Sequence, residues 1–172
     1  DLTNQAVNAF QVEDYNKALS SFEQILEINN MPVVKSDNPD AVDTVIIFNA
    51  GLAAYNAENY EKAIKYYKDA AKYGYNGAKT YSLIGAAYQM MNDTTAALHA
   101  LQEGYEKYPD DNALLESMIQ IYMDLDKTDE ALKNLEKAIA QDPTKPRYYF
   151  AQGALFEKLG QEQKAIDTYK KT

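Results

Sequence analysis

The sequence contains no cysteine and no tryptophan, and it has only 7 glycines and 5 prolines among 172 residues. The absence of cysteine excludes disulfides, thiolate metal sites and cysteine nucleophiles, and it weakly favours an exported protein over a cytosolic one. The best apolar run, residues 45–48, is interrupted by Asn49, so we expect no membrane insertion. Asp1 is not an initiator methionine, which leaves the cellular compartment and the natural start of the chain open.

Positive charge is also scarce, because the formal net charge is −9 and the isoelectric point is about 4.6. The lysines are scattered singly among acidic residues, as in Glu61-Lys62 and Glu136-Lys137. A surface without clustered positive charge disfavours nucleic acid as a partner. In contrast, 15 tyrosines and 5 phenylalanines supply a large apolar area, so the chain is predicted to fold rather than to be disordered.

Alanines recur with a fixed period along most of the chain. Ala63, Ala97, Ala131 and Ala165 are each 34 residues apart, and a large apolar residue follows each of them four positions later. An earlier copy, Ala18 with Phe22, lies 45 residues before Ala63. A fixed period of this length is the signature of a repeat protein, in which stacked helix pairs share one core.

The clearest copy is Tyr81-x-x-Ile84-Gly85-x-x-Tyr88, followed by Ala97, Leu101 and Pro109. This pattern resembles the tetratricopeptide repeat. The resemblance covers essentially the whole chain and implies an all-α fold, a right-handed α-solenoid of about five helix-turn-helix repeats. The expected repeats span residues 1–32, 44–77, 78–111, 112–145 and 146–172.

Helical periodicity supports the same fold independently of the resemblance. Each copy has two segments of about 12–14 residues with apolar positions at helical spacing, joined by short polar turns. A small residue on the first helix, such as Gly51 or Gly85, is expected to let the two helices of a pair approach closely. The final helix carries Glu162, Gln163 and Lys164, which favours a polar end of the solenoid over a segment of a longer protein.

Eleven extra residues, 33–43, separate the first two copies. Asn38 followed by Pro39 reads as a helix N-cap and first helical position. We therefore expect part of this insertion to lengthen the first helix of the second repeat, over residues 39–56, and the rest to form a loop.

Catalytic chemistry has little support in the sequence. Residues 74–80 look superficially like a phosphate-binding loop, but the glycine spacing is wrong, and we predict a helix C-cap at Gly74 followed by an Asn-Gly turn. Residues 124–130 lack the central glycine of a calcium loop. His99 is the only histidine and is predicted to be a surface or half-buried side chain. With no triad, metal signature or nucleotide motif, we predict no enzyme activity and no cofactor.

The resemblance implies that the first helices of successive repeats line a concave groove. Most tyrosines occupy turn or core positions of the repeat, whereas Tyr55 falls outside that set. The predicted partner contacts in this groove are Asn4, Phe48, Asn49, Leu52, Tyr55, Asn56, Lys79, Leu83 and Gln120. The alternative is an ordinary solvated groove without a ligand.

One subfamily holds the carboxylates of chaperone tails with a clamp of five polar residues. Asn49 and Lys79 match two of these positions, whereas Thr3, Val7 and Leu83 occupy the other three, so this function is not expected. Asn4 and Asn49 instead resemble asparagines that hold the backbone of an extended peptide, because an amide both donates and accepts hydrogen bonds.

The sequence thus predicts a non-catalytic scaffold that binds a peptide or protein segment in its groove. Two alternatives stay open, an assembly module that pairs with itself or with other domains, and a regulatory domain cut from a larger protein.

Overall fold

The computed structural model describes residues 1–31 and 43–172, and these residues form α-helices without strands. The chain groups into two compact units, residues 1–97 and residues 98–172, which we call the N-terminal unit and the C-terminal unit. The predicted all-α fold class is confirmed for these residues. Each unit is described by itself below.

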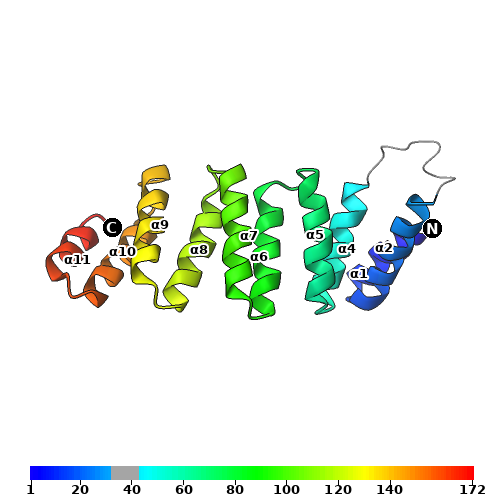
Figure 1. Ribbon diagram of the computed structural model, residues 1–172, viewed down its shortest axis with the longest axis horizontal. Helices are drawn as coiled ribbons and strands as arrows, with labels where there is room; N and C mark the ends of the chain where they lie inside the picture. Colours follow the sequence, from blue (N-terminus) through cyan, green and yellow to red (C-terminus); the bar gives the residue numbers. More distant parts are fainter. Residues whose placement is uncertain (32–42) are drawn as a thin grey trace. The chain divides into compact units, whose positions relative to one another are not determined.

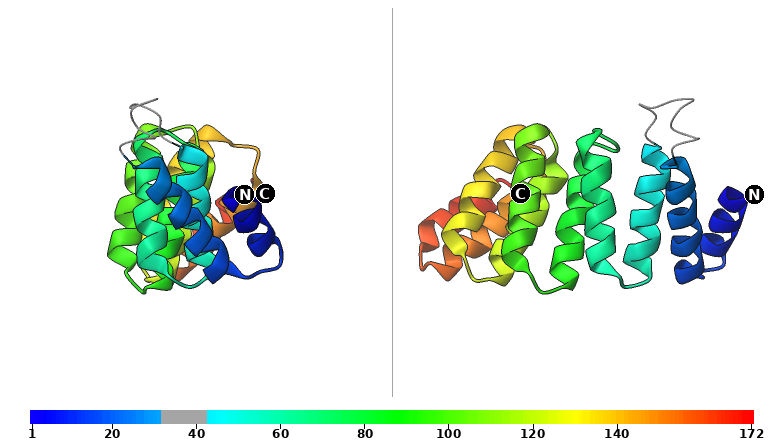
Figure 2. Two further views of the ribbon diagram at one scale, coloured as in Figure 1. Left: turned by 90° about the vertical axis from the view of Figure 1, so that its right-hand side faces the viewer. Right: turned by 45° about the vertical axis from the view of Figure 1, so that its right-hand side comes forward.

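The N-terminal unit contains the first five described helices (Figure 1) and the start of the sixth. These are α1 (Leu2–Gln11), α2 (Tyr15–Asn29), α4 (Thr44–Asn56), α5 (Tyr60–Lys72), α6 (Ala78–Met90) and α7 (Thr94–Lys107), whose later turns belong to the C-terminal unit. Within this unit α1 packs on α2, α2 on α4, α4 on α5, and α5 on α6, as the two views in Figure 2 show.

The C-terminal unit continues with two more helix pairs, α8 (Asn112–Asp124) with α9 (Thr128–Gln141), and α10 (Pro146–Lys158) with α11 (Glu162–Tyr169). Within it α8 packs on α9, α9 on α10, and α10 on α11.

Every turn inside a helix pair has the same backbone conformation. One residue of each turn is left-handed, with φ of 61° at Glu13, 60° at Glu58, 59° at Asn92, 62° at Asp126 and 70° at Gly160. The N–H of the next residue then donates to the carbonyl oxygen five residues earlier, with N···O distances of 2.8–2.9 Å in all five turns. This is the hydrogen bond that ends a helix in a Schellman motif. The repeats therefore share a backbone conformation at this turn as well as a sequence pattern.

The second helices of the pairs begin differently in the two units. In the N-terminal unit the side chains of Asp14, Asn59 and Asp93 each accept a hydrogen bond from the backbone N–H three residues later. In the C-terminal unit the N-cap residues are Lys127 and Gln161, which make no such bond. Only the first set therefore gains the stabilisation of a side-chain cap.

The first helix of the second repeat begins later than the sequence predicts. It starts at Thr44 rather than at residue 39, because Asp43 leaves the helical conformation (φ −80°, ψ 80°) and its carboxylate accepts the N–H of Ile46 at 3.0 Å. The expected lengthening of this helix by the insertion is therefore wrong. The predicted helix start at Asn38 and Pro39 lies outside the described residues.

The turn after α5 agrees with the sequence prediction. Gly74 has φ +68°, its N–H donates to the carbonyl of Ala71 at 3.0 Å, and the N–H of Tyr75 donates to Ala70 at 3.2 Å. These two bonds form a Schellman motif, for which a residue with positive φ is needed. Residues 74–77 are thus a helix end and a turn, and residues 78–80 begin α6, so this segment is not a phosphate loop.

Two glycines make room for a tyrosine ring within their own helix pair. A Cβ atom at Gly51 would lie 2.7 Å from the ring of Tyr67, and one at Gly153 would lie 2.5 Å from the ring of Tyr169. The sequence predicts close approach of the helices at these positions. The structure shows that the space is filled by the aromatic ring that comes from the second helix.

Candidate peptide-binding pocket

A pocket of about 190 Å³ opens in the N-terminal unit between α1 and α4, with α2 beneath it. Its lining consists of Val7, Phe10, Gln11, Phe22, Asn49 and Leu52. Helical spacing explains the set, because residues three or four apart share a face of α1 and residues three apart share a face of α4. First-helix residues from two successive repeats therefore meet at one site.

The pocket has an apolar floor and polar edges. Phe22 is buried, Phe10 and Leu52 are half-buried, and Val7 is 40% exposed. The ring of Phe10 packs edge-on against Tyr15 at a centroid distance of 5.2 Å, which fixes one wall. An apolar floor with few polar groups is the usual composition of a site that takes an uncharged side chain.

The polar edge is formed by two amides, those of Gln11 and Asn49. Asn49 is half-buried and Gln11 is exposed, and neither amide has a hydrogen-bond partner among the residues that the structure describes. Each amide can donate and accept. The amide of Asn49 thus lies at the mouth of an apolar pocket with its donor and acceptor free of bonds to the described residues.

Two other predicted contacts on α4 have partners within the fold. The ring of Tyr55 packs edge-on against Tyr60 at 5.5 Å, and the amide nitrogen of Asn56 donates to the carbonyl of Leu52 at 2.8 Å. Asn56 therefore satisfies the end of its own helix, which leaves its amide less available than that of Asn49.

The structure corrects the placement of Phe48. This side chain is only 5% exposed and packs between the rings of Tyr67 and Tyr75, at centroid distances of 5.6 and 5.2 Å. It points toward α5 and the turn before α6, rather than into the pocket. Phe48 and Asn49 are only 100° apart around the helix. The repeat pattern alone therefore does not tell which of the two faces the groove and which packs against the helices that follow.

The remaining predicted contacts do not line this pocket. Asn4 belongs to a second, open pocket of about 440 Å³ on another face of α1, together with Asp1, Asn8 and Lys17. Lys79 is exposed and Leu83 is half-buried on α6. Gln120 lies in the C-terminal unit, where its amide donates to Asp124 at 2.8 Å. Their roles in binding stay predictions.

The predicted contact set omits four of the six pocket residues, Val7, Phe10 and Gln11 on α1 and Phe22 on α2. Of these four, Phe22 lies on a second helix, whereas the predicted set contains only first-helix residues. The signal for Phe22 in the sequence is the position four residues after Ala18, where every copy carries a large apolar side chain. That position packs between the helices of a pair, and in the first pair it also reaches the floor of the pocket.

Ion pairs and perturbed tyrosines lie outside the pocket. Glu23 on α2 accepts hydrogen bonds from Lys62 at 2.7 Å and from the hydroxyl of Tyr66 at 2.8 Å, both on α5. Burial and the bond to Glu23 raise the pKa of Tyr66, so its hydroxyl stays protonated as a donor. These contacts link the two repeats on either side of the insertion and serve stability.

Metal-binding clusters and membrane-spanning helices are both absent from the part of the chain that the structure describes. No three His, Cys, Asp or Glu residues within residues 1–31 and 43–172 are grouped so that they could hold a metal ion. Over the same residues, none of the helices combines the length and the apolar character needed to cross a bilayer.

Comparison with known families agrees with this geometry. Residues 48–112 match a family model described as tetratricopeptide repeat, and residues 120–160 match a second one described as TPR repeat. Together the two matches cover more than half of the chain, and the chain is a tetratricopeptide-repeat (TPR) protein.

Solved structures show the same fold at low sequence identity. A crystal structure of MamA is 19% identical with a TM-score of 0.70, covering 96% of this chain and 91% of that one. YrrB, described as a TPR protein with an unusual peptide-binding site, is 19% identical with a TM-score of 0.65, covering 99% and 82%. A search of curated protein sequences gave no match.

Proposed function

We propose that this TPR protein is an interaction scaffold whose N-terminal unit binds an extended peptide segment of a partner protein. The observation that carries the proposal is the pocket between α1 and α4, in which Asn49, whose amide has no partner among the residues that the structure describes, borders an apolar floor. The description of YrrB as a peptide-binding TPR protein is compatible with this role.

The size of the pocket favours part of a longer ligand. Its volume of about 190 Å³ is smaller than the roughly 300–1,000 Å³ of pockets that enclose whole small molecules. One apolar side chain fits that space, and burying a side chain of the size of leucine contributes about 1.5–3 kcal/mol. The rest of the affinity then comes from backbone contacts on either side.

Asn49 supplies the first of these backbone contacts. An extended peptide presents alternating N–H and C=O groups, and a single asparagine amide can pair with one of each. Such pairing does not depend on the side chains of the ligand. The pocket therefore selects a peptide that is extended at this point and carries an apolar residue next to the bound peptide group.

The test is selection of a displayed library of random peptides on the full chain, followed by titration of an enriched peptide with purified variants. Asn49→Ala is expected to weaken binding about tenfold, because about 1–2 kcal/mol of hydrogen bonding is lost. Leu52→Ser is expected to weaken it further by making the floor polar.

Asn8→Ala is the matched control, because this exposed asparagine lies on another face of α1. It is expected to bind like the wild type. Equal binding by the wild type, Asn49→Ala and Leu52→Ser would remove the pocket as the site and direct attention to other surfaces of the protein.

A further inference from the structure

The six residues that line the pocket between α1 and α4 are all uncharged. Charge lies instead just after the two helices that carry most of this lining. Glu13 follows α1 and Glu58 follows α4, each as the second residue after its helix. Both side chains are exposed, and the turns that hold them lie at the same end of the two helices (Figure 2). The two carboxylates therefore lie beyond one end of the pocket.

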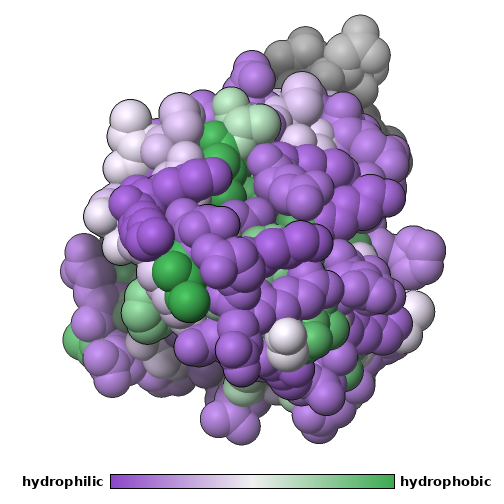
Figure 3. All heavy atoms as spheres, turned by 90° about the vertical axis from the view of Figure 1, so that its left-hand side faces the viewer, coloured by the Kyte–Doolittle hydropathy of each residue, from purple (hydrophilic) through white to green (hydrophobic). Residues whose placement is uncertain are grey.

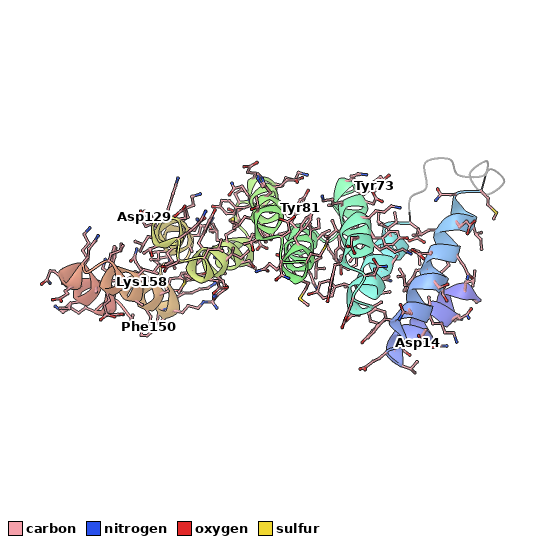
Figure 4. All side chains as sticks on the ribbon, turned by 60° about the horizontal axis from the view of Figure 1, so that its bottom comes forward. Asp14, Tyr73, Tyr81, Asp129, Phe150 and Lys158 are labelled. Carbon is pink, nitrogen blue, oxygen red and sulfur yellow. The ribbon has the colours of Figure 1, made fainter. Side chains whose placement is uncertain are left out.

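Neither glutamate bonds within the described part of the fold. No hydrogen bond or ion pair joins the side chain of Glu13 or Glu58 to any other residue that the structure describes. Their neighbours do have internal partners, since Asp14 caps α2 through the N–H of Lys17, and Asn59 caps α5. Figure 4 shows Asp14 where the chain turns from α1 into α2. The two glutamates are thus distinct from the capping residues beside them.

Both turn positions are unfavourable for a glutamate. The residue there is left-handed, with φ of 61° at Glu13 and 60° at Glu58, a conformation that asparagine, aspartate and glycine adopt more readily than other residues. Those three types occupy the equivalent turns, as Asn92, Asp126 and Gly160. A negative charge is also unfavourable at the C-terminal end of a helix, because of the helix dipole. Stability therefore does not explain the glutamates that follow the two helices of the pocket.

The C-terminal unit treats charge in the opposite way. Glu116 on α8 accepts a hydrogen bond from Arg147 on α10, and Asp126, the equivalent of Glu58, pairs with Lys158 at the end of α10. These four charges are therefore neutralised within the unit. Seen from the α11 end, hydrophobic areas are separated by hydrophilic side chains (Figure 3). In the N-terminal unit, by contrast, an uncharged pocket lies beside carboxylates without an ion pair among the described residues.

From this charge pattern we infer that the pocket takes a basic peptide segment of a partner protein. One apolar side chain enters the pocket, and a lysine or arginine two or three residues away pairs with Glu13 or Glu58. The inference rests on the proposed function and specifies the ligand of that same site. The formal net charge of −9 favours the same kind of partner by attracting it at longer range.

The spacing of the residues fits this ligand. The pocket residue Gln11 lies two residues before Glu13, and the pocket residue Leu52 lies six residues before Glu58. An α-helix rises about 1.5 Å per residue, whereas an extended peptide advances about 3.3 Å per residue. Two or three peptide residues therefore span the distance from the pocket to the ends of α1 and α4, where a long basic side chain reaches the carboxylates.

The first test compares the charge of peptides that different variants select. A displayed library of random peptides is selected in parallel on the wild-type full chain and on the double variant Glu13→Gln with Glu58→Gln, in which only charge is removed. The matched control is Glu27→Gln, which removes an exposed carboxylate from α2. We expect lysine and arginine to be enriched near the apolar residue with the wild type and with the control, and this enrichment to disappear with the double variant.

Titration of one enriched peptide by fluorescence anisotropy gives the size of the effect. The double variant is expected to bind about fivefold more weakly than the wild type, because an exposed ion pair contributes only modestly to affinity. Raising the salt concentration from about 0.1 M to about 1 M shortens the screening length from about 10 Å to about 3 Å. Binding to the wild type should weaken by a similar factor, and the double variant should lose most of this salt dependence.

Asparagine at the two turns separates a binding role from a structural one. Glu13→Asn with Glu58→Asn supplies a residue that accepts positive φ and removes the charge from both helix ends. We expect the Tm to rise by about 2 °C or more, while binding of the enriched peptide weakens as in the glutamine variant. A lower Tm with unchanged binding would overturn the inference, because the glutamates would then serve the fold.

The inference is also overturned if peptides selected on the wild type show no excess of lysine and arginine, or if the double glutamine variant binds an enriched peptide as tightly as the wild type. The pocket variants separate this failure from failure of the proposed function. Binding that depends on Asn49 and Leu52 but not on Glu13 and Glu58 rejects the basic ligand and keeps the peptide site. Binding that depends on none of these four residues rejects both.

Discussion

The helix pairs α4–α5 and α10–α11 place a tyrosine ring over a glycine in the same way, yet they treat the tyrosine hydroxyl differently. Tyr169 donates to Glu157 at 2.9 Å. The hydroxyl of Tyr67 is buried without a hydrogen-bond partner among the described residues, and the position equivalent to Glu157 is Tyr55. Repetition therefore preserves the packing of the ring, while the polar end of the side chain depends on residues that the repeat does not specify.

The largest difference between the two pairs is expected at the phenylalanines. Phe48→Ala should cost about 3–5 kcal/mol, because it empties a closed site between two tyrosine rings. Phe150→Ala removes a side chain that is 64% exposed and should cost less than about 1 kcal/mol. Urea unfolding followed by circular dichroism measures the free energy of unfolding of both variants. Equal decreases in the two variants would contradict the conclusion that Phe48 is enclosed and Phe150 is exposed.

The glycines should respond next most strongly. At Gly51 an added methyl group meets the fully buried ring of Tyr67, a strain of about 1–3 kcal/mol, offset by about 1 kcal/mol of helix propensity. Gly51→Ala is therefore expected to destabilise by up to about 2 kcal/mol. Gly153→Ala should be close to neutral, because the half-exposed ring of Tyr169 can move outward. Thermal unfolding of the two variants provides the comparison.

The tyrosine hydroxyls should give effects of opposite sign. Tyr67→Phe is expected to stabilise by about 1 kcal/mol, because it removes a buried hydroxyl that has no partner. Tyr169→Phe loses its bond to Glu157 and should destabilise slightly. Tyr66→Phe is a useful control, since it removes a hydroxyl that does have a partner, Glu23. A loss of stability in Tyr67→Phe would show that its hydroxyl is bonded.

Tyr67 also leads us to expect that the stability of the folded protein depends on pH in the alkaline range. Burial raises the pKa of Tyr67, and the nearby Tyr55 adds to the rise. The folded state therefore favours the neutral phenol, and this stabilisation is complete below the ordinary tyrosine pKa of about 10 and is lost as the pH rises above it. Tyr67→Phe should flatten this loss in urea titrations at increasing pH.

The smallest effects should come from exchanging the helix caps. Asn59 caps α5 through the N–H of Lys62, whereas its equivalent Gln161 makes no cap bond to α11. Gln161→Asn is expected to gain about 0.5–1 kcal/mol, and Asn59→Gln to lose a similar amount. Hydrogen exchange of the first amides in α5 and α11 tests each cap locally. If both substitutions leave exchange unchanged, the side-chain bond at Asn59 contributes nothing.

The sequence predicts the fold well because the 34-residue period and the helical spacing of the apolar residues indicate the same helix pairs. Ala63 and the residues 34 positions apart from it mark the helix crossings, and Gly74 marks a helix end, since each position needs a small or flexible residue. The start of α4 is missed because Asp43 is as good a cap as Asn38. Local preference alone does not choose between two such caps.

The candidate site is predicted less completely for a geometric reason. Asn49 and Leu52 do line a pocket, but the adjacent Phe48 turns into the next interface. The amide of Asn56 bonds to its own helix, which depends on the side-chain rotamer and not on the residue type. A repeat pattern identifies the face of a helix, whereas contact with a partner depends on single residues at the edge of that face.

The left-handed turn within each helix pair bears on whether whole helix pairs can be exchanged between positions in a repeat protein. The five turn positions carry two glutamates, an asparagine, an aspartate and a glycine, yet they share one φ value to within about ten degrees and one backbone hydrogen bond. The path by which the chain leaves one helix and enters the next is thus independent of the side chain. The sequences of the helix pairs can therefore diverge, and a pair can be duplicated or moved as a unit, because the turn inside each pair is held by backbone hydrogen bonds.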